Sequence, residues 1–179
     1  MDMEMKKDKS HSGYEDRHLE AIEDLVVQID HIAIAVEDLD AAIGWYQRAL
    51  GFSVVGRRIT QGDRTSMISA VLKCGSAVVV LVQGTTPDSQ VVRFIEHFGP
   101  GVQHLAFQVS DMEAALQRVK AAGATLDVGL IKGNGIQQAF LQRTPDSGVR
   151  VEIIERQGGE FTDRTVEHLY REMETKMLY

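Results

Sequence analysis

The chain has 179 residues, which is enough for one domain with a substantial core. Hydrophobic residues make up 44% and charged residues 25%, a balance typical of a globular protein. The formal net charge of −7 argues against a nucleic-acid partner, and no apolar run reaches the roughly 18 residues of a membrane helix. The single cysteine, Cys74, excludes an internal disulfide and a site built from several thiolates.

The first 25 residues are polar and charged and show no sustained apolar period. We expect residues 1–25 to form a mobile extension, with the folded body beginning at Val26. The opening MDMEMKKDKS contains no apolar stretch of the kind found in secretory signals, which favours a cytoplasmic location.

From Val26 onward, one pattern of elements occurs twice. Val27–Val36 is rich in β-branched residues and is predicted to be a strand, and Asp38–Leu50 has the apolar spacing of a helix. The second round opens with the strand Val102–Val109 and the helix Asp111–Ala122. Three strand candidates follow each helix: Phe52–Arg57, Ser66–Lys73 and Ala77–Gln83, then Thr125–Leu130, Ile136–Gln142 and Val149–Glu155. Such an internal repeat predicts an α+β fold of two βαβββ modules.

Two further helices complete the expected organisation. A linking helix, Ser89–Phe98, separates the modules. A C-terminal helix, Thr162–Lys176, carries an apolar stripe of Val166, Leu169, Tyr170 and Met173 that must be buried against something. We expect one domain over 26–179, with module one at 26–86, the linking segment at 87–100, module two at 101–157 and a helical lid at 158–179.

The faces of three strands indicate where chemistry could take place. Because side chains alternate along a strand, His31 lies on the face opposite the bulky residues of the first strand, and His104 repeats this position in the second module. On the last strand, Glu152 points away from its apolar neighbours in the same way. The repeat therefore places two histidines and one carboxylate on faces that do not pack on the module helices.

Two neutral imidazoles and one carboxylate suit a divalent first-row metal that keeps open coordination positions, as in non-haem Fe(II) oxygenases. A lone histidine in a strand is more often a hydrogen-bonded structural residue. Two at repeat-equivalent positions, with a glutamate that would be costly to bury unpaired, favour a metal site. We predict that His31, His104 and Glu152 are the ligands. In the metal-free alternative, Arg150 is the salt-bridge partner of Glu152.

These segments resemble the vicinal oxygen chelate superfamily, whose members build a metal cup from two βαβββ modules. IDHIAIAVEDLDAAIGWYQRALGF is similar to the family's opening, and GVQHLAF and VRVEIIER are similar to its second-histidine and glutamate segments. The resemblance covers roughly Val27 to Arg156 and implies one curved mixed sheet around the metal. It does not imply one reaction, because this scaffold carries dioxygenases, epimerases, glyoxalases and drug-binding proteins.

Within the superfamily, the chain is most similar to the catalytic domain of the 4-hydroxyphenylpyruvate dioxygenases. SQVVRFIEHFGPGVQHLAF, QAFLQRTPDSGVRVEIIER and GGEFTDRTVEHLYREME carry this resemblance. By the match, Gln90, Gln138 and Phe140 fall on the substrate side, and Phe161 falls on a loop that covers the site. Gln103 also matches a substrate-side position, but strand parity places it on the face opposite His104.

Two departures from that family concern the substrate. Arg150 stands where the dioxygenases carry an aromatic residue, and Val166 stands where their covering helix carries a second ring. The aromatic sandwich for a phenol ring is therefore incomplete, and a cation has entered the cup. We expect Arg150 to hold a second anionic group, on a substrate other than 4-hydroxyphenylpyruvate.

The methylmalonyl-CoA epimerases provide a second resemblance, through chain length and the opening motif. That family would place a fourth ligand near Val80, the position that mirrors Glu152 when VLVQG is aligned with EIIER. Valine cannot bind a metal, which leaves a three-ligand site with room for a bidentate 2-oxo acid.

The ligand set and the resemblance together predict a mononuclear Fe(II) dioxygenase or hydroxylase that acts, with O₂, on an anionic 2-oxo acid or similar chelating carboxylate. The alternative is an epimerase or glyoxalase-like isomerase that uses Co, Zn or Mn. A third hypothesis is a non-catalytic drug-binding protein. Because superfamily members with one module pair often dimerise, we expect a homodimer.

Overall fold

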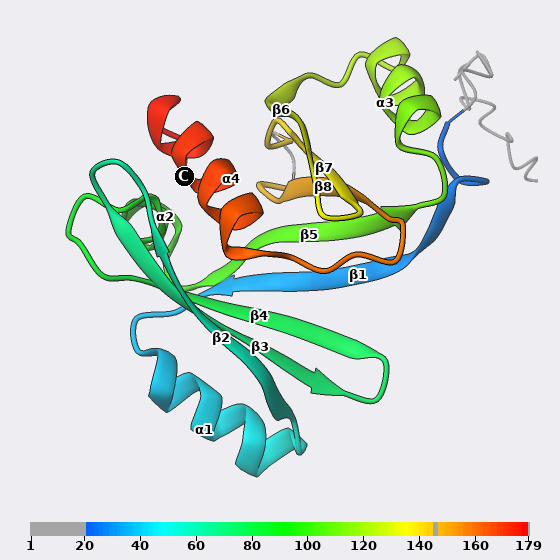
Figure 1. The fold of residues 1–179 in the computed structure, drawn as a ribbon. Coiled ribbons are helices and arrows are strands. Elements are labelled where there is room, and N and C mark those ends of the chain that lie inside the picture. The colour runs from blue at the N-terminus through cyan, green and yellow to red at the C-terminus, as the bar shows by residue number, and fades with distance from the viewer. Residues whose placement is uncertain (1–20, 145–146, 179) are drawn as a thin grey trace, which may run out of the picture.

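The structure, a computed structural model, describes residues 21–144 and 147–178 (Figure 1). Its elements are β1 (Val26–Ala35), α1 (Leu39–Leu50), β2 (Ser53–Gln61), β3 (Ser66–Cys74), β4 (Ala77–Gly84), α2 (Gln90–Phe98), β5 (Gly101–Val109), α3 (Met112–Ala121), β6 (Leu126–Gly133), β7 (Ile136–Leu141), β8 (Arg150–Arg156) and α4 (Asp163–Thr175). This order confirms the predicted α+β fold of two βαβββ modules with a linking and a C-terminal helix. In the described part of the chain, no helix is long and apolar enough to cross a membrane.

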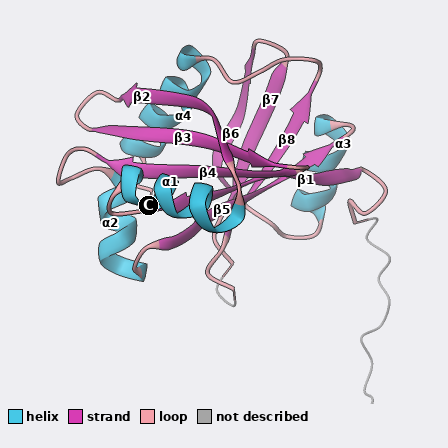
Figure 2. Ribbon diagram, turned by 90° about the horizontal axis from the view of Figure 1, so that it is seen from below, coloured by secondary structure: helices cyan, strands magenta, loops and turns pink. Residues whose placement is uncertain are grey.

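All eight strands form one mixed sheet in the order β2-β3-β4-β1-β5-β8-β7-β6. The modules meet where β1 pairs antiparallel with β5, and each outer neighbour, β4 or β8, runs parallel to its opening strand. In Figure 2 the strands of the first module and β6–β8 run at a steep angle to one another, so the sheet is strongly curved. The strand register confirms the prediction that Val80 in the first module is equivalent to Glu152 in the second. Val80 pairs with Ala33, two residues after His31, and Glu152 pairs with Ala106, two residues after His104.

Helices α1 and α3 cover the outer face of their own modules. Each begins at an aspartate, Asp38 or Asp111, whose side chain accepts a hydrogen bond from a backbone N–H in the first turn. Leu39 and Ile43 of α1 pack among residues of β3 and β4, and Met112 of α3 packs with Ile153 of β8. The opposite face, which carries the histidines, is left free for α4.

The folded body begins earlier than the sequence suggests. Residues 1–20 of the expected extension lie outside the described residues, but residues 21–25 form a turn beside α3. Ile22 and Leu25 pack against the α3 core, and Asp24 pairs with Arg118. The predicted boundary at Val26 is therefore wrong by about five residues, because two isolated apolar side chains complete a core that periodicity does not reveal.

Helix α4 lies across the concave side of the sheet, between the β2–β3 hairpin and β6 (Figure 1). Its residues Tyr170 and Met173 are buried, and Met173 packs with Val128, Ile131 and Phe140 of the second module. Strand β2 continues to Gln61, beyond the predicted end at Arg57, and this longer hairpin reaches α4. The apolar stripe of the C-terminal helix is thus buried over the cup.

Candidate metal centre

His31, His104 and Glu152 come together on the concave face from three adjacent strands. His31 of β1 lies opposite Ala106 of β5, which in turn pairs with Glu152 of β8. Ala106 is fully buried and small, so the two side chains on either side of it can meet. The His31 and His104 Nε2 atoms are 3.2 Å apart, and each lies 3.4 Å from Glu152 Oε2.

This triangle of atoms fits a divalent metal. Ligand atoms bonded at about 2.1 Å are separated by about 3.0 Å in octahedral and about 3.4 Å in tetrahedral coordination. The second carboxylate oxygen, Glu152 Oε1, is buried and has no hydrogen-bond partner among the described residues. An unpartnered buried carboxylate oxygen is costly, and a metal ion would compensate it. Among the described residues, this is the one His/Cys/Asp/Glu group with such spacing.

Each histidine is oriented by the residue before it. His31 Nδ1 donates to Asp30 Oδ1 at 2.7 Å, and His104 Nδ1 donates to Gln103 Oε1. These hydrogen bonds leave both Nε2 atoms available, as metal-binding histidines require. Asp30 and Gln103 are the extra residues at two β-bulges, where the β1–β5 register shifts. The bulges bring the side chains of Asp30 and Gln103 to the same face as the histidines. The prediction that Gln103 lies on the face opposite His104 is therefore wrong.

Electrostatics favours a neutral imidazole at His104. Burial lowers its pKa to about 3, assisted by the nearby charges of Arg150 and Arg143. Burial also raises the pKa of Glu152 to about 7, against an opposing contribution from His31. For Asp30, burial by itself would raise the pKa, but hydrogen bonds from Arg156 and His31 outweigh it and hold the pKa well below its ordinary value.

Several other predicted residues surround the triangle. The Phe140 ring meets His104 edge-on with centroids 5.2 Å apart, and Phe161 meets His31 in the same way at 5.9 Å. A small cavity lies between α4 and the sheet, with His104, Gln90, Gln103 and Phe140 in its wall. The side-chain amide of Gln138, on the same face of β7 as Phe140, is buried without a hydrogen-bond partner among the described residues.

Arg150 has a different ion-pair partner from the one considered in the metal-free alternative. Its guanidinium pairs with Asp127 of β6, with Nη2 at 3.0 Å and Nε at 3.1 Å from Oδ2, rather than with Glu152. The side chain is almost fully buried beside His104, its neighbour in the β5–β8 register. The sequence did not indicate Asp127 as the partner, because this ion pair depends on the curvature of the sheet between β6 and β8, which lie on either side of β7.

The model of the Glyoxalase/Bleomycin resistance protein/Dioxygenase superfamily matches residues 28–153, well over half of the chain. The chain belongs to this superfamily, also called the vicinal oxygen chelate superfamily. The match confirms the resemblance drawn from the DH, QH and glutamate segments.

Relatives within the superfamily represent two kinds of enzyme. The chain is 30% identical to the ethylmalonyl-CoA/methylmalonyl-CoA epimerase of Cereibacter sphaeroides, over 72% of the chain and 98% of that protein. It is 27% identical to the 4-hydroxyphenylpyruvate dioxygenase of Pseudomonas aeruginosa, over 53% of the chain but 28% of that enzyme.

Solved structures show the same two groups. A 4-hydroxymandelate synthase variant from Streptomyces coelicolor superposes with a TM-score of 0.76, covering 85% of this chain and 55% of that one at 21% identity, which shows the shared fold. The methylmalonyl-CoA epimerase of Mycobacterium tuberculosis superposes with a TM-score of 0.63, covering 74% and 89% at 32% identity.

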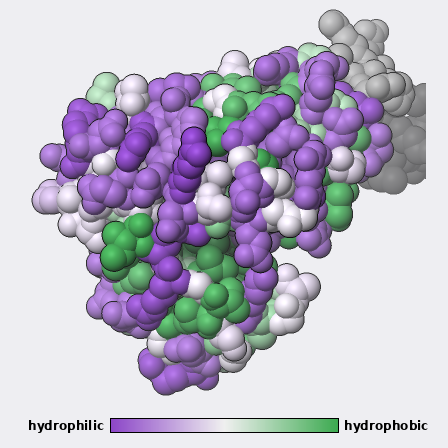
Figure 3. Space-filling model, in the orientation of Figure 1, coloured by the Kyte–Doolittle hydropathy of each residue, from purple (hydrophilic) through white to green (hydrophobic). Residues whose placement is uncertain are grey.

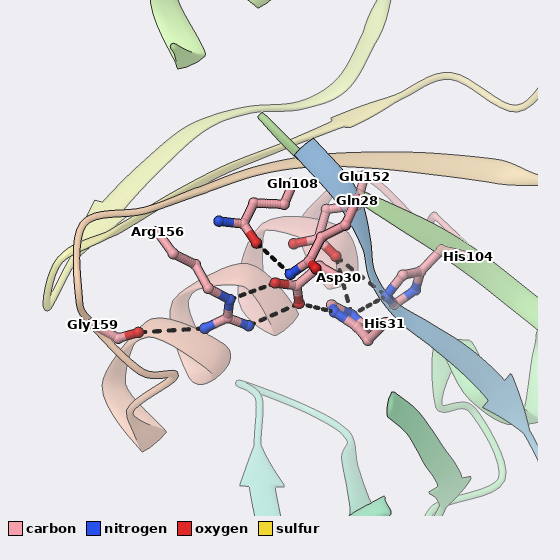
Figure 4. A network of polar contacts seen from close by, with 8 residues as sticks. All are labelled: Gln28, Asp30, His31, His104, Gln108, Glu152, Arg156 and Gly159. Carbon is pink, nitrogen blue, oxygen red and sulfur yellow. Dashed lines mark hydrogen bonds and ion pairs between the residues drawn. The ribbon is translucent and has the colours of Figure 1, made fainter. Parts of the chain in front are cut away.

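Three residues take positions around this superfamily site that the sequence reasoning did not assign to them: Asp30, Gln103, which had been matched to the substrate side, and Arg156. The first two precede the histidines at equivalent points of the repeat, a signal that the sequence does contain. Arg156 shares strand parity with Glu152 on β8, and its guanidinium binds Asp30 (Figure 4). Parity alone could not show that it reaches across β5 to β1.

Ala106→Leu is expected to abolish metal binding without unfolding the protein. The larger side chain would occupy the space through which His31 and Glu152 meet, at a cost of about 1–3 kcal/mol in stability. Ala139→Leu is the matched control, because Ala139 is equally buried but packs toward α3. Equilibrium dialysis with Co²⁺ and thermal melting would compare the two variants. Equal metal affinity in both would contradict the assigned geometry.

Proposed function

We propose that this chain is a mononuclear Fe(II) dioxygenase or hydroxylase that acts on a 2-oxo acid or a similar chelating carboxylate. The observation that carries this proposal is a three-ligand triangle beneath a covering helix, with Val80 where a fourth ligand would lie. Three ligands on one side leave three octahedral positions, enough for a bidentate substrate and O₂. Bound iron would supply the activation of O₂.

The surrounding side chains would bind and orient the substrate. The side-chain amide of Gln138 and the buried Oε1 of Gln90 have no hydrogen-bond partner among the described residues. The Gln138 amide N–H could donate to an oxygen of the substrate, and Gln90 Oε1 could accept from a substrate hydroxyl. The rings of Phe140 and Phe161 flank the two histidines and would exclude water. We assign Arg150, whose charge lies next to His104, to an anionic group of the substrate. Helix α4 would close the cavity during turnover.

The test is O₂ consumption by protein loaded anaerobically with Fe(II), screened over a panel of 2-oxo acids. We expect one or more acids to cause O₂ uptake with an equal release of CO₂. Binding of acids without O₂ uptake would favour the drug-binding hypothesis instead. Uptake that persists in His31→Ala protein would show that the reaction does not use this site.

A metal-dependent epimerase is the second candidate, supported by the end-to-end match to the Cereibacter sphaeroides enzyme. An open hollow adjoins the metal cavity, shares Gln90 and Met173 with it, and is lined by Arg64 and Arg93. Such a hollow could take the anionic arm of a CoA thioester. Solvent-deuterium exchange at the 2-position of methylmalonyl-CoA, catalysed by Co²⁺-loaded protein without O₂, would establish this function over the oxygenase.

We also propose that the protein is a homodimer. Large apolar side chains are exposed on the first module and at the start of β1: Val27, Ile29, Trp45, Leu50, Val55 and Ile59. Apolar areas are visible in the lower part of Figure 3, over the region of α1 and the first-module strands. Exposed patches of this kind often mark association surfaces. Light scattering should give twice the chain mass, and a monomer at working concentration would refute the proposal.

A further inference from the structure

Arg156 connects the candidate metal centre to the segment that covers it. Its Nη2 donates to Asp30 Oδ1 at 2.8 Å and its Nε donates to Asp30 Oδ2, while Asp30 also accepts from His31 (Figure 4). On its other side, Nη1 donates to the Gly159 carbonyl at 3.4 Å, and the guanidinium lies 5.0 Å from the centre of the Phe161 ring. The same guanidinium therefore holds a ligand's partner and the covering loop, residues 157–162.

The contacts form a closed circuit. His31 is hydrogen-bonded to Asp30, Asp30 is paired with Arg156, and Arg156 lies against the Phe161 ring. The centre of the Phe161 ring in turn lies 5.9 Å from the centre of the His31 ring. The side chain of Asp30 is 6% exposed and that of Arg156 is 27% exposed, so the ion pair is shielded from solvent. A bidentate guanidinium–carboxylate pair fixes the geometry of both groups. Movement of the loop would therefore disturb the orientation of Asp30 and His31.

The covering loop is seated closely enough to transmit such a constraint. A side chain at Gly159 would meet the carbonyl oxygen of Asn134 at 1.7 Å, so only glycine allows this approach to the β6–β7 turn. Asn134 donates its side-chain amide to the Glu160 carbonyl at 2.9 Å, and Gln157 N donates to the Gly135 carbonyl at 2.8 Å. The loop is therefore hydrogen-bonded to the β6–β7 turn, and Arg156 lies at the start of the loop.

We propose that Arg156 is a positioning residue that couples metal binding at His31 to closure of the covering loop and α4. This inference rests on the proposed metal site. A metal that fixes His31 would favour the Asp30–Arg156 geometry and, through it, the closed loop. Because coupling between two sites is reciprocal, loss of the link should weaken metal binding and also free the loop from the metal's influence.

Arg58 provides a matched control. It holds the same region from β2, donating from Nε to Asp163 Oδ1 at 2.6 Å and from Nη2 to the Phe161 carbonyl at 2.9 Å. Within residues 21–144 and 147–178, Arg58 makes no hydrogen bond or ion pair with the candidate ligands or with Asp30. Arg58→Met should therefore loosen the loop without altering metal affinity, whereas Arg156→Met should alter both.

The experiment is amide hydrogen exchange over residues 157–175, with and without Co²⁺, alongside Co²⁺ titration monitored by its visible absorption. In wild-type protein we expect Co²⁺ to slow exchange by about tenfold. In Arg156→Met, Co²⁺ should bind about 10–100-fold more weakly and leave exchange unchanged. In Arg58→Met, exchange should be faster, with normal affinity and the metal-dependent slowing retained. Arg156→Lys keeps the charge but not the bidentate geometry, so its Co²⁺ affinity and its Co²⁺-dependent slowing of exchange should both lie between those of Arg156→Met and wild type.

The outcomes separate this inference from the proposed function. If wild-type protein does not bind Co²⁺, the metal site is wrong and the coupling fails with it. If it binds Co²⁺ but Arg156→Met or Arg156→Lys keeps the full metal-dependent slowing, the coupling alone is overturned. Equal loss of slowing in Arg58→Met would also overturn it, because a general loosening of the loop would then explain the result.

Discussion

Glu152→Gln is expected to abolish tight metal binding while leaving the metal-free protein at least as stable as wild type. The wild-type carboxylate is buried, its Oε1 has no hydrogen-bond partner among the described residues, and burial raises its pKa to about 7. A neutral amide of the same shape removes this cost, so we expect a gain between zero and about 2 kcal/mol in the free energy of unfolding. Urea denaturation of metal-free protein and Co²⁺ titration measure the two quantities.

The histidine variants complete this prediction. His31→Ala and His104→Ala should each lose metal and activity while the fold survives, because the strands that carry them pair through the backbone. The loss of metal affinity should exceed about 10–100-fold, the loss that is typical when a residue hydrogen-bonded to a metal ligand is removed. If Glu152→Gln lost more than about 2 kcal/mol of metal-free stability, or kept wild-type affinity, the cluster would be a structural hydrogen-bonding network.

Glu174→Gln is expected to have the opposite effect on stability, by releasing the end of α4 from the β2–β3 hairpin. Glu174 accepts hydrogen bonds from the backbone N–H groups of Asp63, Arg64 and Thr65, and from the Thr65 hydroxyl. A neutral amide cannot accept all of these well, so we expect a loss on the order of 2 kcal/mol. If the protein is the proposed oxygenase, the metal ligands stay in place, but O₂ uptake should exceed product formation because α4 covers the site less well.

The same carboxylate predicts a pH dependence. Burial by itself would raise the pKa of Glu174, but the Thr65 hydroxyl and the hairpin N–H groups outweigh it and lower the pKa below its ordinary 4.5. The stability it contributes is therefore present above pH 4.5 and is lost as the pH falls through the lower folded-state value. The protection of the α4 amides, taken relative to the intrinsic exchange rate at each pH, should fall in this acidic range in wild type, and less so in Glu174→Gln.

If O₂ uptake in Glu174→Gln stayed matched to product formation although amide exchange in α4 had become faster, the lid role would be contradicted. Deletion of 162–179 is a more severe form of the same test, with iron expected to stay bound. It would also expose Val128, Ile131 and Phe140, which pack against Met173, so the single substitution is the sharper experiment.

The internal repeat and the alternation of strand residues were enough to predict the fold and to bring His31, His104 and Glu152 to one face. Both signals are local: β-branched strands, aspartate-capped helices and period-two side chains depend on residues close in sequence. The equivalence of Val80 and Glu152 could be predicted for the same reason, because the strand pairing of the first module is repeated in the second.

Tertiary structure decided what depends on the pairing of distant strands. The bulges that bring Asp30 and Gln103 beside the histidines arise from the β1–β5 register, which residue parity within one strand cannot express. Arg150 pairs with Asp127, and Arg156 with Asp30, because the curved sheet brings β6 near β8 and lets β8 side chains reach β1. The apolar stripe of α4 showed that the helix must be buried, but its partners came from both modules, and only the folded sheet places them together.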